Sequence, residues 1–162
     1  MSPARGSQAS SNPHQPSIFA AENLSPAYPQ RAAWGTSRPL RAWQAAALEK
    51  YLAEGPQDFL AVATPGAGKT TFALRVATEL LSAGEVHKVT IVCPTEHLKY
   101  QWAEAAARVG IHIDPSYTNS QGALGSRFDG VALTYAQVAA NPNLHRARTD
   151  ARRTLVVLDE IH

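Results

Sequence analysis

The stretch ATPGAGKTT, residues 63–71, decides the fold that this sequence predicts. A short apolar run, residues 59–63, comes directly before it, and residues 70–83 after it carry apolar side chains at helical spacing. Gly66 and Gly68 permit backbone angles that turn successive N–H groups inward, which makes an anion-binding nest at the start of a helix. The stretch therefore predicts a strand, a phosphate-binding turn and a helix.

The turn follows the phosphate-binding pattern G-x-x-x-x-G-K-[ST] except at its first position, where this sequence has Ala63. Lys69 is placed to reach the β- and γ-phosphates of a nucleoside triphosphate, and the Thr70 hydroxyl is a hard oxygen ligand for Mg²⁺. The alternative is a glycine-rich connection that binds nothing. The expected strand and helix on either side favour the binding function.

A second informative stretch is TLVVLDEIH, residues 154–162, in which two acids follow an apolar strand. A phosphate-binding loop of this kind works with a carboxylate at the tip of another strand, which holds Mg²⁺ through water. Asp159 fits that part. Glu160 beside it is the candidate general base that polarises an attacking water. Without the loop, adjacent acids after a strand would indicate a solvated turn.

Between these stretches, apolar runs rich in β-branched residues alternate with segments of helical periodicity. This alternation is typical of an α/β fold with a parallel sheet covered by helices on both faces. The expected helices are residues 40–52, 70–83 and 95–109, and the expected strands are 59–63, 89–93, 111–113, 131–134 and 155–158.

Composition sets limits on the class of protein. The 162 residues are 44% hydrophobic and 17% charged, and the formal net charge of +2 does not by itself indicate a nucleic-acid partner. The one cysteine, Cys93, excludes an internal disulfide and fits a reducing compartment, so we expect a cytoplasmic protein with an inert buried thiol. No apolar stretch approaches the roughly 20 residues that span a bilayer, so we expect no membrane association.

The first 37 residues differ from the rest. They hold seven serines and five of the eleven prolines but three charged residues, a composition that cannot bury enough apolar surface to offset the entropy of ordering. We predict a disordered tail over residues 1–37, with an organellar transit peptide as the alternative. The folded domain is expected over residues 38–162.

Five motifs together resemble the first motor domain of superfamily 2 helicases and translocases, the DEAD/DEAH-box-like group. TPGAGKT at 64–70 resembles motif I, and DEIH at 159–162 resembles the D-E-x-H form of motif II. PTEHLKYQW at 94–102 is similar to motif Ia in the branch that holds repair helicases and restriction-enzyme motor subunits. LRAWQ at 40–44 resembles the adenine-reading element upstream of motif I, and ALTYAQV at 132–138 resembles the T-Y motif that follows Ia.

The resemblance implies a RecA-like P-loop domain that binds ATP, Mg²⁺ and DNA or RNA, with DNA favoured. It assigns adenine contacts to Gln44 and Arg41, and places Pro94, Thr95 and Thr134 along the nucleic-acid backbone. The metal site would hold Thr70 and Asp159, the catalytic residues would be Lys69, Asp159 and Glu160, and His162 would couple the site to a second motor domain. The implied phosphate site consists of Thr64, Gly66, Gly68, Lys69, Thr70 and Thr71.

The resemblance covers part of such a motor. A second motor domain, with its arginine finger, and the motif after D-E-x-H are not in this sequence, and in the family a strand that follows D-E-x-H inserts between the motif I and motif II strands. We therefore expect an incomplete sheet and a chain that is inactive alone, within a parent that hydrolyses ATP. The alternatives are the motor portion of a restriction or phage-defence complex, and a non-catalytic nucleotide-binding module.

Two further features have plain explanations. Trp43 and Trp102 stand at helical spacing, which indicates core packing rather than stacking on bases. The basic run at residues 145–153 is interpreted as a solvated connection before the last strand.

Overall fold

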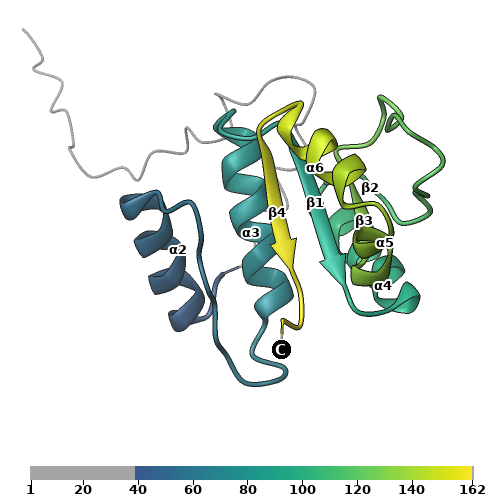
Figure 1. Cartoon of the computed structure of the whole chain (residues 1–162). Helices are drawn as coiled ribbons and strands as arrows, with labels where there is room; N and C mark the ends of the chain where they lie inside the picture. The colour runs from purple at the N-terminus through teal and green to yellow at the C-terminus, as the bar shows by residue number, and fades with distance from the viewer. Residues whose placement is uncertain (1–38, 162) are drawn as a thin grey trace, which may run out of the picture.

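A computed structural model describes residues 39–161 of the chain. The predicted tail over residues 1–37 and the coupling residue His162 lie outside the described residues. In chain order the elements are α2 (Ala42–Glu54), α3 (Lys69–Ser82), β1 (Lys88–Cys93), α4 (Glu96–Arg108), β2 (Ile113–Asp114), β3 (Gly130–Thr134), α5 (Tyr135–Ala140), α6 (Pro142–Asp150) and β4 (Thr154–Leu158) (Figure 1).

The strands form one parallel sheet in the order β2-β3-β1-β4. The central strand β1 pairs with β3 on one side and β4 on the other, with Cys93 opposite Thr134 and Val92 opposite Leu158. The carboxyl ends of these three strands therefore lie at one edge of the sheet, where ligands bind in open α/β sheets. The predicted α/β class with a parallel sheet is confirmed.

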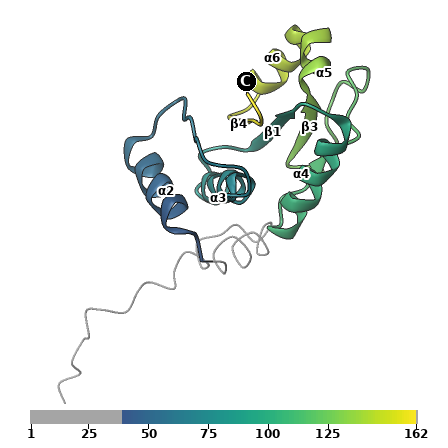
Figure 2. The ribbon, with the colours of Figure 1, turned by 90° about the horizontal axis from the view of Figure 1, so that it is seen from below.

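Helices cover both faces of the sheet, as Figure 2 shows with α3 and α4 on one side and α5 and α6 on the other. Side chains alternate along the strands to serve both layers. Ile91 and Cys93 of β1 pack with Trp102 of α4 in the larger core cluster. Val131 and Leu133 of β3 instead pack with residues of the opposite layer, beside Val138 of α5.

Helix α2 lies outside these layers and packs on α3. Its buried Leu48 meets Phe72 and Val76 of α3 in a separate cluster. The Trp43 and Phe72 ring centroids are 5.5 Å apart. This contact places the first turn of α2 beside the loop that precedes α3.

The prediction of a strand at residues 59–63 is wrong. Those residues have no regular secondary structure, and Leu60 and Val62 are 78% and 85% exposed. A strand needs a hydrogen-bonding neighbour, but a cavity of about 650 Å³ is lined by this segment and by β4. The segment is apolar, but it has no partner strand among the described residues, and its two largest aliphatic side chains are exposed rather than buried.

Two smaller predictions also change. The short strand expected at 111–113 is β2, Ile113–Asp114, because the N–H of Ile111 instead bonds to Ala106 O at 2.9 Å and closes the end of α4. Helices α5 and α6 were not predicted, and the interpretation of residues 145–153 as a solvated connection is wrong where they belong to α6, in which His145 is 5% exposed. Both are short and begin at strong caps, Thr134 with Gln137 for α5 and Asn141 for α6, so capping rather than periodicity determines them.

Candidate nucleotide-binding site

The loop before α3 has the conformation that its glycines allow. Gly66 and Gly68 have φ of 74° and 91°, in the left-handed region that favours glycine, and the N–H of Ala67 bonds to Thr64 O at 3.1 Å. A Cβ atom on Gly68 would lie 2.6 Å from Nε2 of Gln44. Glycine is therefore required at 68 both for the backbone angle and for the close approach of α2.

Three side chains from the start of α2 hold this loop. Arg41 Nη1 donates to Gly66 O at 3.1 Å, Trp43 Nε1 to Ala67 O at 3.0 Å, and Gln44 Nε2 to Gly68 O at 2.8 Å. Three successive carbonyl oxygens of the loop are thus directed toward α2. We call this set of contacts the α2 clamp. Each of these three oxygens thus accepts a hydrogen bond from a side chain at the start of α2.

The first turn of α3 differs from that of three other helices. Thr95, Thr134 and Asn141 cap α4, α5 and α6 with their side chains, whereas α3 begins at Gly68, which has no side chain to offer. The initial N–H groups of a helix need acceptors. An uncapped helix start that carries Lys69 as its first residue suits a phosphate.

Asp159 follows β4 at the carboxyl edge of the sheet and is held by three hydrogen bonds. Its Oδ2 atom accepts from Trp102 Nε1 at 2.8 Å, its carbonyl oxygen from Tyr135 Oη at 2.7 Å, and its N–H donates to Val92 O at 2.8 Å. Glu160 next to it has φ of 57°, and among the described residues no other non-glycine residue has a positive φ. Such backbone angles gather at functional sites.

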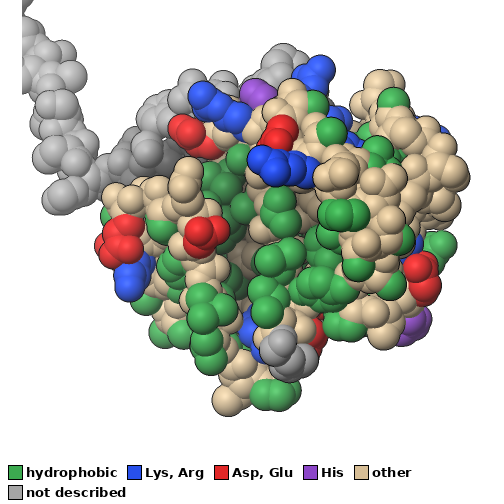
Figure 3. All heavy atoms as spheres, viewed as in Figure 1, with side chains coloured by type: hydrophobic (Ala, Val, Ile, Leu, Met, Phe, Trp, Pro, Cys, Tyr) green, Lys and Arg blue, Asp and Glu red, His purple; other side chains and the backbone are tan. Residues whose placement is uncertain are grey.

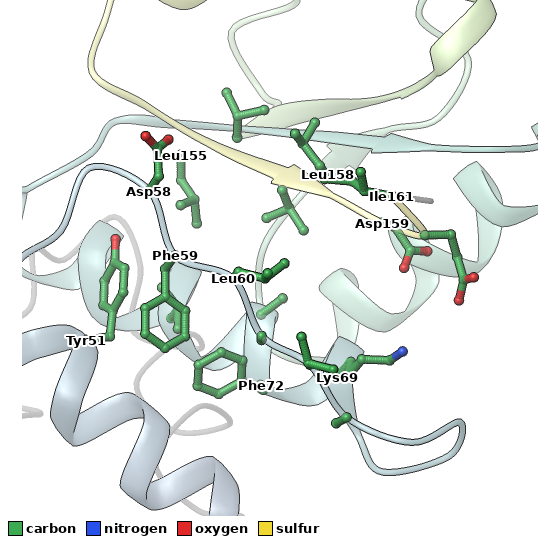
Figure 4. A pocket seen from close by; sticks show the side chains of 18 of the residues that line it. Tyr51, Asp58, Phe59, Leu60, Lys69, Phe72, Leu155, Leu158, Asp159 and Ile161 are labelled. Atoms are coloured by element: carbon green, nitrogen blue, oxygen red, sulfur yellow. The ribbon is translucent and has the colours of Figure 1, made fainter.

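One cavity brings the predicted catalytic residues together. The cavity of about 650 Å³ is lined by Lys69, Asp159 and Glu160, in addition to apolar residues of α3, β4 and the segment 57–63. Figure 4 shows the side chains of Lys69 and Asp159 on the same side of this cavity. The structure thus brings Lys69, after the glycine loop, to the same cavity as the acids that lie far along the chain.

Two protonatable groups behind the acids stay neutral. Burial raises the pKa of the Cys93 thiol, and the Asp159 carboxylate raises it further. Burial, followed by Asp159, also raises the pKa of the Tyr135 hydroxyl. Cys93 is fully buried, and its Sγ lies 3.4 Å from Leu133 O, which fits the inert thiol that the sequence predicted.

The residues assigned to nucleic acid lie at the ends of β1 and β3. Pro94 and Thr95 are exposed, and Thr95 caps α4. Thr134 is 5% exposed, and its hydroxyl accepts from the N–H of Gln137 at 3.1 Å. The two sites are neighbours because Cys93 and Thr134 pair in the sheet. Contacts to nucleic acid stay a prediction for all three residues.

The adenine contacts also stay a prediction. Gln44 is 2% exposed, and its Oε1 atom accepts from the N–H of Arg41 at 2.8 Å while its Nε2 donates to the loop. Sequence reasoning missed the hydrogen bonds of Trp43, Trp102 and Tyr135. A buried indole N–H requires a hydrogen-bond partner, so the sequence indicated that each tryptophan needs an acceptor. It did not indicate which residue supplies that acceptor.

A parallel sheet, a glycine loop that leads into an uncapped helix and a carboxylate at a neighbouring strand tip define the P-loop class of α/β domain. The chain belongs to the family described as "Type III restriction enzyme, res subunit", whose model matches residues 37–162. It therefore contains a superfamily 2 helicase-like N-terminal motor domain, as the resemblance implied.

Similar proteins occur in mycobacteria. An uncharacterized protein of Mycobacterium leprae (strain TN) is 62% identical over 126 residues, which are 78% of this chain and 21% of that protein. An uncharacterized protein of Mycobacterium tuberculosis (strain ATCC 25618 / H37Rv) is 60% identical over 124 residues, 76% of this chain and 21% of its own length. The chain thus spans about a fifth of the curated relatives that it matches.

Two features are absent from the described residues, 39–161. No helix there is long and apolar enough to cross a membrane. No group of three or more His, Cys, Asp or Glu side chains there could hold a metal ion. A P-loop site does not need such a group, because its Mg²⁺ is held by a hydroxyl, the phosphates and a carboxylate.

Proposed function

We propose that residues 38–162 bind ATP with Mg²⁺ and serve as the N-terminal motor domain of an ATP-dependent helicase or translocase that acts on nucleic acid. The observation that carries this proposal is the meeting of Lys69, Asp159 and Glu160 at one cavity, beside a loop whose carbonyl oxygens point to α2. The family match supports a helicase-like motor at the level of the domain.

Each residue then has a defined part. Lys69 pairs with the β- and γ-phosphates, and the N–H groups at the start of α3, together with Thr64, Gly66, Gly68 and Thr71, form the phosphate cradle. Thr70 and Asp159 would hold Mg²⁺, and their hard oxygen atoms fit that ion. Mg²⁺, when bound, neutralises charge on the phosphates. Glu160 orients and deprotonates the attacking water.

Turnover also needs charge stabilisation from outside this domain. An arginine finger is worth about 10³ to 10⁵ in rate, and the resemblance places it on a second motor domain in the same polypeptide, to which His162 would be coupled. DNA is favoured over RNA, because the motif at 94–102 and the family description both indicate restriction-type motors. The family description also favours the alternative function, the motor of a restriction or phage-defence complex. The lone buried thiol supports a cytoplasmic location.

The test compares two variants of the full-length protein. Lys69→Ala should weaken binding of a fluorescent ATP analogue with Mg²⁺ by about 10- to 100-fold, because a charge-assisted contact is lost. Glu160→Gln should bind the analogue as the wild type does but stop hydrolysis. The control is Lys50→Ala, an exposed lysine of α2. Wild-type turnover in Glu160→Gln would refute the assignment of the base, and unchanged binding in Lys69→Ala would refute the ATP site.

A further inference from the structure

The carboxylate of Asp159 is fixed by elements other than its own strand. Trp102 reaches it from α4, Tyr135 reaches its carbonyl oxygen from the first position of α5, and Val92 of β1 holds its N–H. The hydrogen bond from Trp102 takes up Oδ2, and the hydrogen bonds within the described residues leave Oδ1 for a metal-bound water. Asp159 can therefore not change its orientation independently of α4 and α5.

Trp102 is more than a packing residue. It is 4% exposed within the larger core cluster, and its ring carries a polar N–H into that apolar surrounding. A buried indole N–H needs an acceptor, and here the acceptor is the ionisable acid at the cavity. A hydrogen bond to a carboxylate is charge-assisted and directional, so the rigid ring sets the orientation of the carboxylate.

The helices that carry Trp102 and Tyr135 are joined to each other. Lys99 of α4 is 3% exposed, and its Nζ donates to Oε1 of Gln137 on α5 at 3.0 Å. Gln137 is also the second member of the capping box at Thr134. A shift at the start of either helix is thereby passed to the other.

The same helices reach the surface that the proposed function gives to nucleic acid. Helix α4 starts at the exposed Thr95, and Trp102 lies seven positions later, about 10 Å along the helix axis. Tyr135 directly follows Thr134 at the start of α5. Helix α4 therefore begins at an exposed residue assigned to nucleic acid, α5 begins at the buried Thr134, and each helix carries a hydrogen bond to Asp159.

We propose that Trp102 and Tyr135 are positioning residues that tie the metal-binding carboxylate of Asp159 to α4 and α5, so that nucleic acid bound at the exposed start of α4 tightens the Mg²⁺ site. This inference rests on the proposed function and adds the route by which nucleic acid regulates the nucleotide site. Asp159 binds the metal, and the two aromatic residues act through it.

The test removes single hydrogen-bond donors in the full-length protein. Trp102→Phe removes the indole N–H, and Tyr135→Phe removes a hydroxyl. The matched control is Tyr117→Phe, which removes a buried hydroxyl that donates to Gly122 O, far along the chain from Asp159. The first readout is the affinity for a fluorescent ATP analogue, measured as Mg²⁺ is added. The Mg²⁺ concentration that gives half of the full increase in affinity is the Mg²⁺ midpoint.

We expect Trp102→Phe to raise that Mg²⁺ midpoint about 10-fold, as is usual when a partner of a metal ligand is removed. Tyr135→Phe should raise it by a smaller factor, because it holds the backbone rather than the carboxylate. Affinity for the analogue without Mg²⁺ should equal that of the wild type in both variants and in Tyr117→Phe. A residue with a purely structural role would lower the metal-free affinity as well.

The second readout is the effect of single-stranded DNA. In the wild type, saturating DNA should lower the Mg²⁺ midpoint, and in Trp102→Phe this shift should be lost. An unchanged midpoint, or an equal loss of metal-free affinity, would overturn the positioning role. If Trp102→Phe does not fold, Tyr135→Phe decides by the same criteria. A wild type that binds no Mg²⁺–nucleotide would instead refute the proposed function itself.

Discussion

At the scale of single residues, His145 of α6 is buried in a polar position with an unsatisfied atom. Its Nε2 lies 2.9 Å from Oδ1 of Asn119, which makes Nε2 the protonated nitrogen, and its buried Nδ1 meets no hydrogen-bond partner among the described residues. The guanidinium of Arg148 is nearby, over the ring of Tyr117. Burial, followed by the charge of Arg148, lowers the pKa of His145 below 6.5. The folded state therefore favours the neutral imidazole.

This pKa shift makes stability depend on pH. Below pH 6.5 the unfolded chain takes up a proton at His145 that the folded chain does not, so the contribution is complete above pH 6.5 and is lost as the pH falls toward the lower folded pKa. We expect His145→Gln, which keeps a donor toward Asn119, to lose less stability between pH 8 and pH 5 than the wild type. Urea unfolding measures this.

The control for that experiment is His97→Gln, at an exposed position of α4. It makes the same change of side chain at a histidine that is exposed to solvent. Equal slopes for the wild type and His145→Gln would show that His145 titrates alike in both states.

At the scale of elements, α2 acts on the loop rather than on the sheet. The α2 clamp joins three of its side chains to three successive carbonyl oxygens. Because Gln44 is 2% exposed and both ends of its amide are in use, this geometry favours a role in shaping the phosphate cradle. A residue that shapes the cradle affects every nucleoside triphosphate alike, whereas a residue that reads adenine discriminates among bases.

We therefore expect Gln44→Leu to weaken the binding of ATP and the binding of GTP by the same factor. The change leaves the N–H of Arg41 without its partner and removes one of two hydrogen bonds to Gly68 O, which still accepts from the N–H of Phe72. Gln101→Leu, at an exposed glutamine of α4, is the control. Competition binding with both nucleotides is the measurement. A selective loss of ATP would instead support the adenine contact.

At the scale of the whole molecule, one side of the sheet is open. Among the described strands, β4 pairs with β1 alone, and the facing segment 59–63 forms no strand. Leu158 is 49% exposed and Ile161 is 60% exposed. Figure 3 shows hydrophobic side chains exposed on this face, which is hollowed beside β4. An open strand edge with exposed apolar side chains favours association between chains.

We expect the isolated 162-residue chain to unfold over a broad temperature range, to associate in solution and to show no ATP turnover. The unpaired edge explains the first two results, and the third follows from the proposed function, which places the arginine finger on a second motor domain. Thermal unfolding, light scattering and an ATPase assay with single-stranded DNA test this. A cooperative transition above about 50 °C, together with turnover stimulated by DNA, would show instead a self-sufficient module.

Local patterns determined much of this protein. The glycine loop with Lys69 and Thr70, the helix that follows and the apolar strands ending at Cys93 and Leu158 were all readable, because short-range sterics, capping and periodicity determine them. The order of these elements also predicted the parallel sheet. Parallel strands end at a common edge, and so the sequence placed the loop and the acids near each other in outline.

Contacts between distant residues were decided by the tertiary structure. The hydrogen bond from Trp43 to the loop spans 24 positions, and that from Trp102 to Asp159 spans 57. Helical spacing indicates that each ring packs in the core, but it does not indicate which acceptor the ring N–H meets. Residues 59–63 also show that local sequence does not determine which distant residues will be partners. Their composition predicts burial, but a strand exists where a partner backbone accepts and donates its hydrogen bonds, and that partner is a property of the assembled sheet.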